Sequence, residues 1–234
     1  MIGSPRVHHR RTDSTNERAK QLALAGAPHG TLVTADAQTA GRGRQGRAWL
    51  APPGTALLMS LILRELGGAQ AYLPLAAALA VCDACERSAP VGCSIKWPND
   101  VWIEGRKVAG ILIEGRPRDG WAVLGIGLNV GTAPDEFPPE LHGVATSLRA
   151  AGADPVPTVG AVREALLRAL EERLAAAPEA IVGAWRERDA LIGREVRWDG
   201  GEGTAAGIED SGALLVDTEA GRLALDAGEV HLRR

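Results

Sequence analysis

Three arginines share one glycine-rich stretch, Gly41-Arg-Gly-Arg-Gln-Gly-Arg47. No acidic residue occurs between Asp36 and Glu65, so nothing close in the sequence neutralises these guanidinium groups. Glycine lets a backbone approach a ligand closely, and guanidinium groups bind carboxylates and phosphates. We therefore expect a flexible loop that binds an anion through its arginines. They are Arg42, Arg44 and Arg47.

The same stretch fits the dinucleotide-binding pattern G-x-G-x-x-G. That pattern requires a helix directly after the glycines and an acidic residue on the following strand. Here Ala48-Trp-Leu-Ala-Pro-Pro-Gly54 follows and then a strand, which excludes a dinucleotide site. A solvated basic loop stays open as an interpretation. So does an RNA-binding loop, although Trp49 is its single aromatic residue and gives no stacking platform.

A second group of chemically active residues combines Lys96-Trp-Pro-Asn-Asp100 with Lys107-Val-Ala-Gly-Ile-Leu-Ile-Glu114. Both lysines lie in or beside apolar strands, where an unpaired ammonium group is costly, so both need an acid or an anionic ligand. Pro98 turns the chain and presents Asn99 and Asp100 at a strand end, where polar side chains often contact ligands. Taken alone, the first motif also fits a β-turn formed by Asn and Asp.

The elements that must position these residues follow from apolar periodicity and turn residues. Ser14-Thr-Asn-Glu17 has capping-box spacing and starts a helix that ends near Gly26. Further helices are predicted at 70–87 and from Val159 to Leu174. Strands are predicted at 31–35, 55–63, 92–97, 101–104, 107–114 and 121–130. Short connections between the last four predict an antiparallel meander, and glycines in the last strand permit close approach of another group.

The composition changes near Leu191, after which short segments alternate with glycine-rich turns. Strands are predicted at 195–198, 203–209, 213–218 and 222–226. This tail is too short to build a large core. We therefore predict two domains, a main domain over residues 1–188 and a small β-barrel over residues 189–234.

The bulk properties exclude several classes of protein. A net charge of −3 over 234 residues gives no general attraction to nucleic acid or to an anionic membrane. The sequence contains no run of about 18 apolar residues, so no transmembrane helix is predicted. The segment 1–11 lacks the apolar core of a secretory signal. The sequence has three cysteines, Cys82, Cys85 and Cys93, which cannot all pair in disulfides within the chain. This favours a reducing, cytoplasmic compartment. Cys82 and Cys85 lie in an Ala/Leu-rich run with no second pair, so we interpret them as core or surface residues.

Taken in order, six segments resemble the biotin–protein ligase family over essentially the whole chain. They are Ser14–Asn16, Gln38, Gly41–Arg47, Lys96–Asp100, Lys107–Leu112 and Gly125–Val130. The resemblance implies an α+β fold with a mixed, largely antiparallel sheet, flanking helices as in class II synthetases, and an SH3-like C-terminal barrel. It implies that biotin and ATP give biotinyl-5′-AMP and pyrophosphate, and that an acceptor lysine then attacks the acyl carbon and releases AMP.

The resemblance also implies roles for single residues. A biotin site is implied at Ser14, Thr15, Asn16, Gln38, Gly41, Arg42, Gly43, Arg44, Lys107, Gly110 and Leu112. An ATP or adenylate site is implied at Arg44, Arg47, Trp49, Lys96, Asn99 and Asn129, and a Mg²⁺ site at Asp100. Arg42, Arg44 and Lys107 are implied as catalytic residues, because cations offset the repulsion between a carboxylate and a triphosphate. Ser14 is expected both to cap its helix and to face biotin.

Expectations about partners follow from the same resemblance. The family points to a biotin carboxyl carrier protein as the acceptor, and an exposed sheet edge leaves a homodimer open. About ten residues precede the first catalytic strand, so we expect the monofunctional class without an N-terminal DNA-binding domain, and no specific DNA binding. Two alternatives are a lipoate or octanoate ligase or transferase, and a non-catalytic RNA- or phosphate-binding module. We also expect the Gly41–Trp49 loop to become ordered when the adenylate binds.

Overall fold

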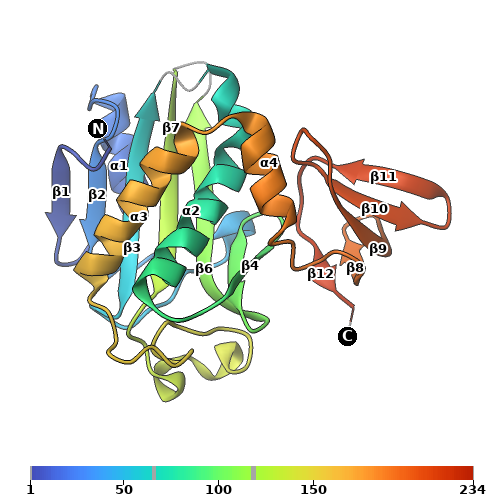
Figure 1. Ribbon diagram of the computed structural model, residues 1–234. Coiled ribbons are helices and arrows are strands. Elements are labelled where there is room, and N and C mark those ends of the chain that lie inside the picture. Colours follow the sequence, from blue (N-terminus) through green and yellow to red (C-terminus); the bar gives the residue numbers. More distant parts are fainter. Residues whose placement is uncertain (1, 65–66, 117–119, 234) are drawn as a thin grey trace.

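The computed structural model describes residues 2–64, 67–116 and 120–233, and it contains two β-sheets (Figure 1). The larger sheet has seven strands, in the spatial order β1 (Arg6–His9), β2 (Leu32–Ala35), β3 (Ala56–Arg64), β7 (Trp121–Asn129), β6 (Arg106–Arg116), β5 (Asp100–Ile103) and β4 (Cys93–Lys96). Strands β1 and β2 run parallel, and all other neighbours in this sheet run antiparallel. The expected α+β fold with a mixed, largely antiparallel sheet is confirmed. Strand β1 was not predicted.

Helices cover both faces of this sheet (Figure 1). Helix α1 (Thr15–Leu24) packs on one face, against β2, β3 and β7. Helices α2 (Leu73–Ser88) and α3 (Val159–Leu174) pack on the opposite face, and α4 (Pro178–Arg186) packs against α2. Helix α4 was not predicted from the sequence, while α2 and α3 match their predicted ranges closely.

Strand β3 supplies side chains to two apolar cores. Because successive side chains of a strand point to opposite faces, Met59 and Leu61 join the main core beneath α2 and α3. Ile62 points the other way and packs with Val33 and Trp121 beneath α1. Burial on both faces explains why this strand is a nearly continuous apolar run.

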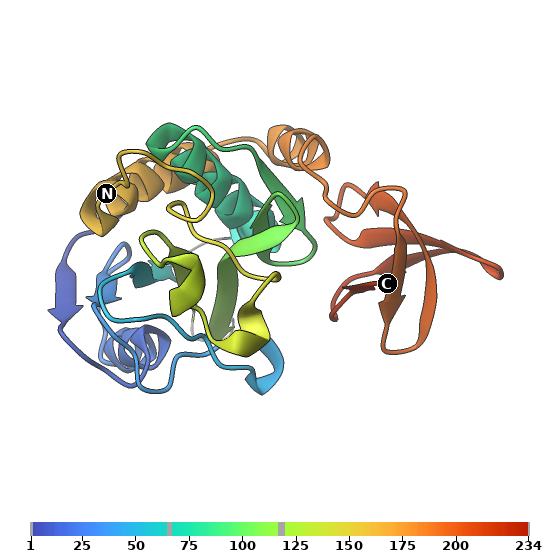
Figure 2. The same ribbon diagram turned by 90° about the horizontal axis from the view of Figure 1, so that it is seen from below.

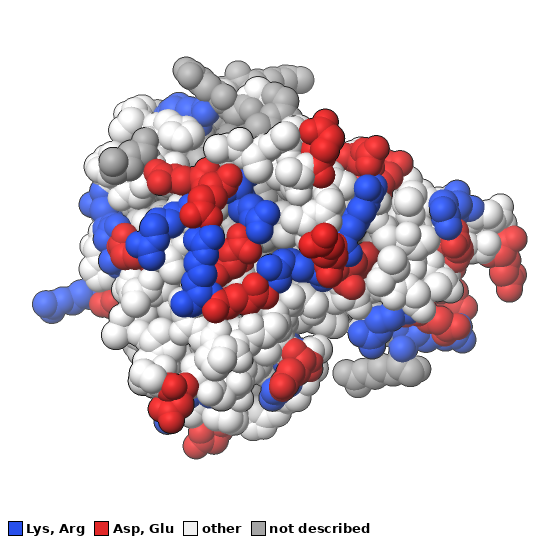
Figure 3. Space-filling view, viewed as in Figure 1, with Lys and Arg blue, Asp and Glu red and all other residues white. Residues whose placement is uncertain are grey.

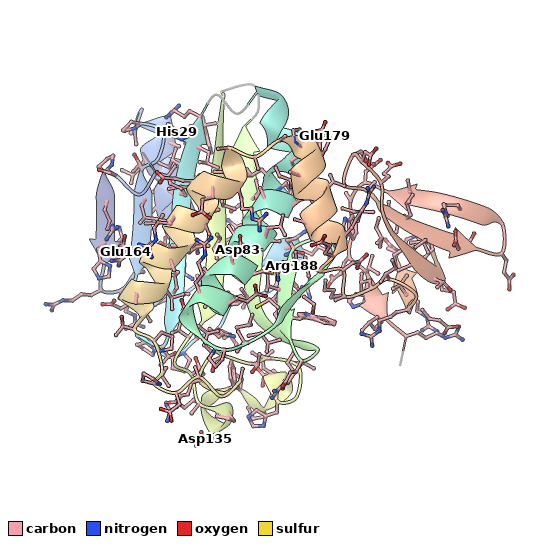
Figure 4. All side chains as sticks on the ribbon, viewed as in Figure 1. His29, Asp83, Asp135, Glu164, Glu179 and Arg188 are labelled. Atoms are coloured by element: carbon pink, nitrogen blue, oxygen red, sulfur yellow. The ribbon has the colours of Figure 1, made fainter. Side chains whose placement is uncertain are left out.

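Ion pairs connect the helices at the surface. Figure 3 shows basic and acidic side chains interspersed over this face, with no large patch of one sign. Arg173 donates two hydrogen bonds to Asp83, at 2.7 and 3.0 Å. Arg188 lies 3.5 Å from Asp83 and 2.6 Å from Glu86 (Figure 4). These contacts join α2 to α3 and to the segment that follows α4.

The cysteines belong to the main core. Cys82 and Cys85 of α2 are fully buried and Cys93 nearly so, which confirms the core interpretation of the first two. Among the helices of the described residues, none is long and apolar enough to cross a membrane.

The smaller sheet lies beside the larger one, at the C-terminal end of the chain (Figures 1 and 2). Its five antiparallel strands have the order β11 (Gly221–Leu225), β10 (Leu214–Thr218), β9 (Gly201–Ile208), β8 (Glu195–Trp198) and β12 (His231–Leu232). Strand β12 was not predicted. It pairs with β8. The division at residues 188 and 189 remains a prediction.

Candidate active site

A cavity of about 740 Å³ lies between the Gly41–Trp49 loop, the large sheet and strand β12. The predicted site residues in its wall are Ser14, Thr15, Asn16, Gln38, Arg42, Gly43, Arg44, Arg47, Trp49, Lys96, Asn99, Asp100, Lys107, Gly110, Leu112 and Asn129. Among the predicted residues, only Gly41 is absent from the wall. Residues from distant parts of the sequence therefore meet around one space.

Strand β7 sets the order of groups along this cavity. Gly125, Gly127 and Asn129 point to the same face because alternate residues of a strand do so. They span about 13 Å at the usual rise of a strand. Asn16 lies over Gly125, and the Trp49 ring lies over Gly127. The strand thus places a polar corner, an aromatic middle and an amide end in sequence.

A pair of glycines forms the middle of the cavity floor. Gly110 of β6 and Gly127 of β7 lie opposite each other in the sheet register. A Cβ at Gly127 would lie 2.8 Å from Cδ2 of Trp49, and a Cβ at Gly110 would lie 3.1 Å from Nζ of Lys107. The same Nζ lies 5.7 Å from the centre of the indole ring. Only glycine at these positions lets the ring and the ammonium group rest on the sheet.

Backbone hydrogen bonds of Gly41 and Gly43 stabilise the Gly41–Trp49 loop. Its carbonyl accepts a hydrogen bond from the Trp49 backbone N–H at 2.9 Å, and Gly43 N–H donates to the Arg47 carbonyl at 2.7 Å. A Cβ at Gly41 would lie 2.9 Å from Nε2 of Gln38. These contacts close the loop on itself and bring Trp49 over the sheet.

Uncharged polar groups gather at the corner where α1 begins. Oε1 of Gln38 accepts hydrogen bonds from N and Oγ1 of Thr15, at 2.7 and 3.1 Å. Ser60 of β3 approaches Oγ1 of Thr15 at 2.8 Å and Oδ1 of Asn16 at 2.5 Å. Such amide and hydroxyl groups match a ligand that carries neutral N–H and C=O groups.

Ser14 occupies the N-cap position of α1, but its side chain makes no capping hydrogen bond. The predicted capping box is therefore wrong. Glu17 instead pairs with Lys20 at 2.6 Å and with Arg42. Ser14 is only 2% exposed and lies in the cavity wall.

The expectation that nothing neutralises the arginine loop is wrong. Arg42 pairs with Glu17 of α1 and lies 3.7 Å from Glu114 of β6. Glu114 also binds Lys20 at 3.0 Å. Burial raises the pKa of Glu114, but hydrogen bonds from Asn16 and Lys20 outweigh burial and hold the pKa below its ordinary value. Acids far away in the sequence thus surround Arg42.

The other two loop arginines contact the segment that precedes β12. Arg44 donates to Oδ1 of Asn99 at 3.2 Å and to the Gly228 carbonyl at 3.0 Å. Arg47 pairs with Glu229. Burial lowers the pKa of Arg44, so a nearby anion would stabilise its charged form. The loop is held between the large sheet and the end of the chain.

The two predicted lysines have different surroundings. Nζ of Lys107 lies 2.6 Å from Oδ1 of Asp100, so this lysine has the acidic partner that its position requires. Nζ of Lys96 lies 5.8 Å from the centre of the Trp102 ring, and burial lowers the pKa of Lys96. An anionic ligand would offset that loss of hydration.

Two asparagines line the same cavity. Asn99 donates from Nδ2 to the Ile111 carbonyl at 2.9 Å. Asn129 donates from Nδ2 to the Thr146 carbonyl at 2.9 Å, but its Oδ1 is buried and finds no partner among the described residues. A buried acceptor without a partner is costly, so Asn129 marks a place for an N–H donor of a ligand.

Sequence reasoning missed several residues of the cavity wall, such as Trp102, Arg194 and His231, and three polar residues beside it. Ser60 left a signal, because it is the single polar residue between Ala56 and Leu63. Glu114 ended a predicted strand without being given a role. Glu229 has no local signal, since its contact with Arg47 exists only in the folded chain.

The comparisons with known proteins agree with this geometry. Residues 8–131 match the family described as the biotin/lipoate A/B protein ligase family, and residues 191–233 match the biotin protein ligase C terminal domain. The chain is 38% identical over 240 residues to the biotin–[acetyl-CoA-carboxylase] ligase of Mycobacterium tuberculosis, covering 95% of this chain and 87% of that protein. It is 39% identical over 240 residues to the ligase of the same name from Paracoccus denitrificans, covering 94% and 97%.

Among solved structures, the fold is similar to biotin protein ligase from Aquifex aeolicus in complex with biotin and ATP. The TM-score is 0.86 at 31% sequence identity, and the alignment covers 99% of both chains. The similarity therefore includes both sheets.

Proposed function

The chain belongs to the biotin/lipoate A/B protein ligase family, and we propose that it activates biotin with ATP and joins the biotinyl group to a lysine of a biotin carboxyl carrier protein. The order of groups along β7 supports this function. A neutral polar corner lies over Gly125, an indole lies over Gly127 with an ammonium group over the facing Gly110, and Asn129 follows. That order suits a ligand with a polar ring, an acyl chain ending in a carboxylate, and a nucleotide.

In the first step, a carboxylate oxygen of biotin attacks the α-phosphorus of ATP. The bond from that phosphorus to the bridging oxygen breaks, and pyrophosphate leaves. Two like charges about 4 Å apart repel by roughly 4 kcal/mol in a protein-like medium. We assign Lys107 and Arg44 to offset this repulsion and to stabilise charge at the α-phosphate. Arg42 can join them once a ligand anion replaces its contact with Glu17.

The nucleotide end of the site combines cations with an amide. Lys96 and Arg47 line the cavity and suit the phosphates, and burial of Lys96 favours an anionic partner. Oδ1 of Asn129 suits an N–H donor such as the amino group of adenine. Asn99 holds Arg44 in place through its Oδ1.

Asp100 is the candidate ligand for Mg²⁺. This ion commonly takes one or two carboxylates, and phosphate oxygens and water complete its six ligands. Asp100 lies in the cavity wall, and its side chain is 14% exposed. No group of three His, Cys, Asp or Glu residues suited to a metal occurs in the described ranges, which fits an ion held mainly by ATP. When bound, Mg²⁺ would neutralise phosphate charge beside Lys107.

In the second step, the amine of the acceptor lysine attacks the acyl carbon of biotinyl-5′-AMP. The bond from that carbon to the phosphate oxygen breaks, AMP leaves, and the new amide nitrogen loses a proton to solvent. The attacking group comes from the partner, so the chain needs no nucleophile of its own. Trp49 over the sheet would shield the mixed anhydride from water until the acceptor arrives.

Incubation with ATP, biotin and a carrier domain tests this function. We expect biotin-dependent release of pyrophosphate, followed by biotin on the carrier lysine. Pyrophosphate release that depends on lipoate or octanoate would replace this proposal with a lipoate or octanoate ligase. No turnover with any of the three acids, together with salt-sensitive RNA binding, would favour the binding module.

We place the protein in the cytoplasm, as a candidate homodimer. Its three buried, unpaired thiols suit a reducing compartment. The β4 edge of the large sheet is covered, since Ile95 exchanges backbone hydrogen bonds with Arg188 and Ala190. The β1 edge is the one available to a second copy. Sedimentation equilibrium would measure the state of association.

A further inference from the structure

Ser60 is a polar side chain inside an apolar strand. It is fully buried, lies opposite Gly125 in the sheet register, and stands outside the cavity wall. Its Oγ lies 2.8 Å from Oγ1 of Thr15 and 2.5 Å from Oδ1 of Asn16, and both of these residues do line the cavity. Any effect of Ser60 on a ligand must therefore pass through its two neighbours.

The Asn16 amide has one orientation that its surroundings allow. Its Nδ2 lies 2.9 Å from the carboxylate of Glu114 and 3.4 Å from the carbonyl of Leu112. Turning the amide over would set Oδ1 against two acceptors, so Oδ1 faces Ser60. A Cβ at Gly125 would lie 2.8 Å from Cγ of Asn16, so this glycine provides the space for the amide.

The hydroxyl hydrogens of the corner are all used inside it. The Thr15 hydroxyl lies 2.8 Å from Oγ of Ser60 and 3.1 Å from Oε1 of Gln38, which already accepts from the Thr15 backbone N–H. Both amide hydrogens of Asn16 point to acceptors of β6, so Oδ1 of Asn16 needs the Ser60 hydrogen. Ser60 donates to this oxygen at 2.5 Å, and its own Oγ then accepts the Thr15 hydrogen. Oγ1 of Thr15 therefore has no hydrogen left to donate and can only accept.

We propose that Ser60 is a positioning residue for the ureido group of biotin, an inference that rests on the proposed ligase function. Ser60 donates to Asn16, its shorter contact, and accepts the Thr15 hydrogen, which leaves Oγ1 of Thr15 as an acceptor toward the cavity. A ureido N–H donates to that oxygen. A dithiolane ring or an alkyl chain has no N–H, so the same corner selects against lipoate and octanoate.

Ser60→Ala tests the proposal, because it removes the proton and changes the volume little. We expect the KM for biotin to rise about tenfold, while kcat and the KM for ATP stay within about twofold. Desthiobiotin, which keeps the ureido group and lacks the thioether ring, should show the same rise. Ser60→Cys, with a weaker donor of similar size, should give an intermediate rise.

Ile62→Val is the matched control, since it loses a small group from the same strand and face two residues away. Its KM for biotin should stay within about twofold, and thermal melts separate folding from binding. Equal rises in both KM values in Ser60→Ala, or the same rise in Ile62→Val, would overturn the assignment. If Ser60→Ala yields no folded protein, the KM of Ser60→Cys for biotin tests the proposal instead. Absence of biotin-dependent turnover in the unmutated protein refutes the ligase function, whereas an unchanged KM in a folded variant refutes only the role of Ser60.

Discussion

Nζ of Lys107 and Oδ1 of Asp100 lie 2.6 Å apart on neighbouring strands, inside the cavity. The register of the two strands shifts between Val101 and Trp102, close to this pair. Removing one member would leave a partly buried charge without its partner. The pair therefore holds, before any ligand arrives, the cation that the proposed reaction needs.

Lys107→Ala should lower adenylate formation about 100-fold, equivalent to about 3 kcal/mol of transition-state stabilisation. The reason is the loss of the ammonium group that faces both reacting anions. Biotin-dependent pyrophosphate release measures the effect. Arg106→Ala, the neighbouring position on β6, removes a cation outside the cavity wall and serves as the control. Equal activity of the two variants would contradict the role of Lys107.

Arg44→Lys should reduce adenylation by about tenfold or more, although the charge is kept. Arg44 contacts Asn99 and the Gly228 carbonyl through two different nitrogens, which a single ammonium group cannot reproduce. Steady-state kinetics with ATP as the varied substrate measure the loss. Arg197→Lys, at an exposed ion pair of the second sheet, is the matched control. A variant that keeps full activity would show that charge alone suffices.

Gly127→Ala should displace Trp49, because the new Cβ would lie within 3 Å of the indole ring. We expect at least about a tenfold loss of kcat/KM, measured by pyrophosphate release, with a smaller effect on stability. Gly183→Ala on α4 is the control, since nothing lies within 4 Å of its new Cβ. That helix substitution should stabilise the fold by about 0.5–1 kcal/mol. An active Gly127→Ala variant would show that the ring position is unimportant.

Glu114→Gln should make the protein less stable near neutral pH, and this difference from the unmutated protein should shrink in acid. The folded-state pKa of Glu114 lies below its ordinary value of 4.5, so ionised Glu114 stabilises the fold above that value. The contribution disappears as the pH falls from 4.5 through the folded-state pKa, where Lys20 and Arg42 lose one of their two acidic partners. Urea unfolding should show that the substitution lowers the free energy of unfolding by about 1–2 kcal/mol at pH near 7 and by less at pH near 3. Glu219→Gln in an exposed turn is the control, and a pH-independent difference at Glu114 would contradict this account.

Ligands should protect the arginine loop from trypsin, which cleaves after arginine. Biotin plus ATP should bring new contacts to Arg42, Arg44 and Arg47 and slow cleavage of the Gly41–Trp49 segment. Mass spectrometry of timed digests measures the rate. Cleavage at Arg10 and Arg11, exposed and far from the cavity in sequence, gives an internal reference. Equal rates with and without ligands would show that the loop does not close.

The sequence predicted the central part of the fold because apolar runs leave a strong pattern. Strand β3 is buried on both faces, so Ala56–Leu63 is almost wholly apolar. The missed elements lack such a pattern. Strand β1 consists of Arg, Val, His and His at a sheet edge, and β12 has two residues. Helix α4 has nine residues and begins at a proline, a residue that is also typical of loops.

The candidate site was predicted in part, for a similar reason. Motifs that are continuous in the sequence, such as Lys96–Asp100, supplied cavity residues directly. Charge partners could not be predicted this way, because Glu17 and Glu229 reach the loop only through the fold. The capping box failed because Glu17 had a stronger partner in Arg42, which local spacing does not reveal.

The carbonyl of Gly228 and the carboxylate of Glu229 hold two of the three loop arginines. The segment between β11 and β12 thus anchors the loop on which the proposed activation step depends. A fragment that stops before β8 would keep the corner built by Thr15, Gln38 and Ser60, yet it would lose both anchors of the loop. Such a truncated protein should still recognise the vitamin while its ability to use the nucleotide collapses.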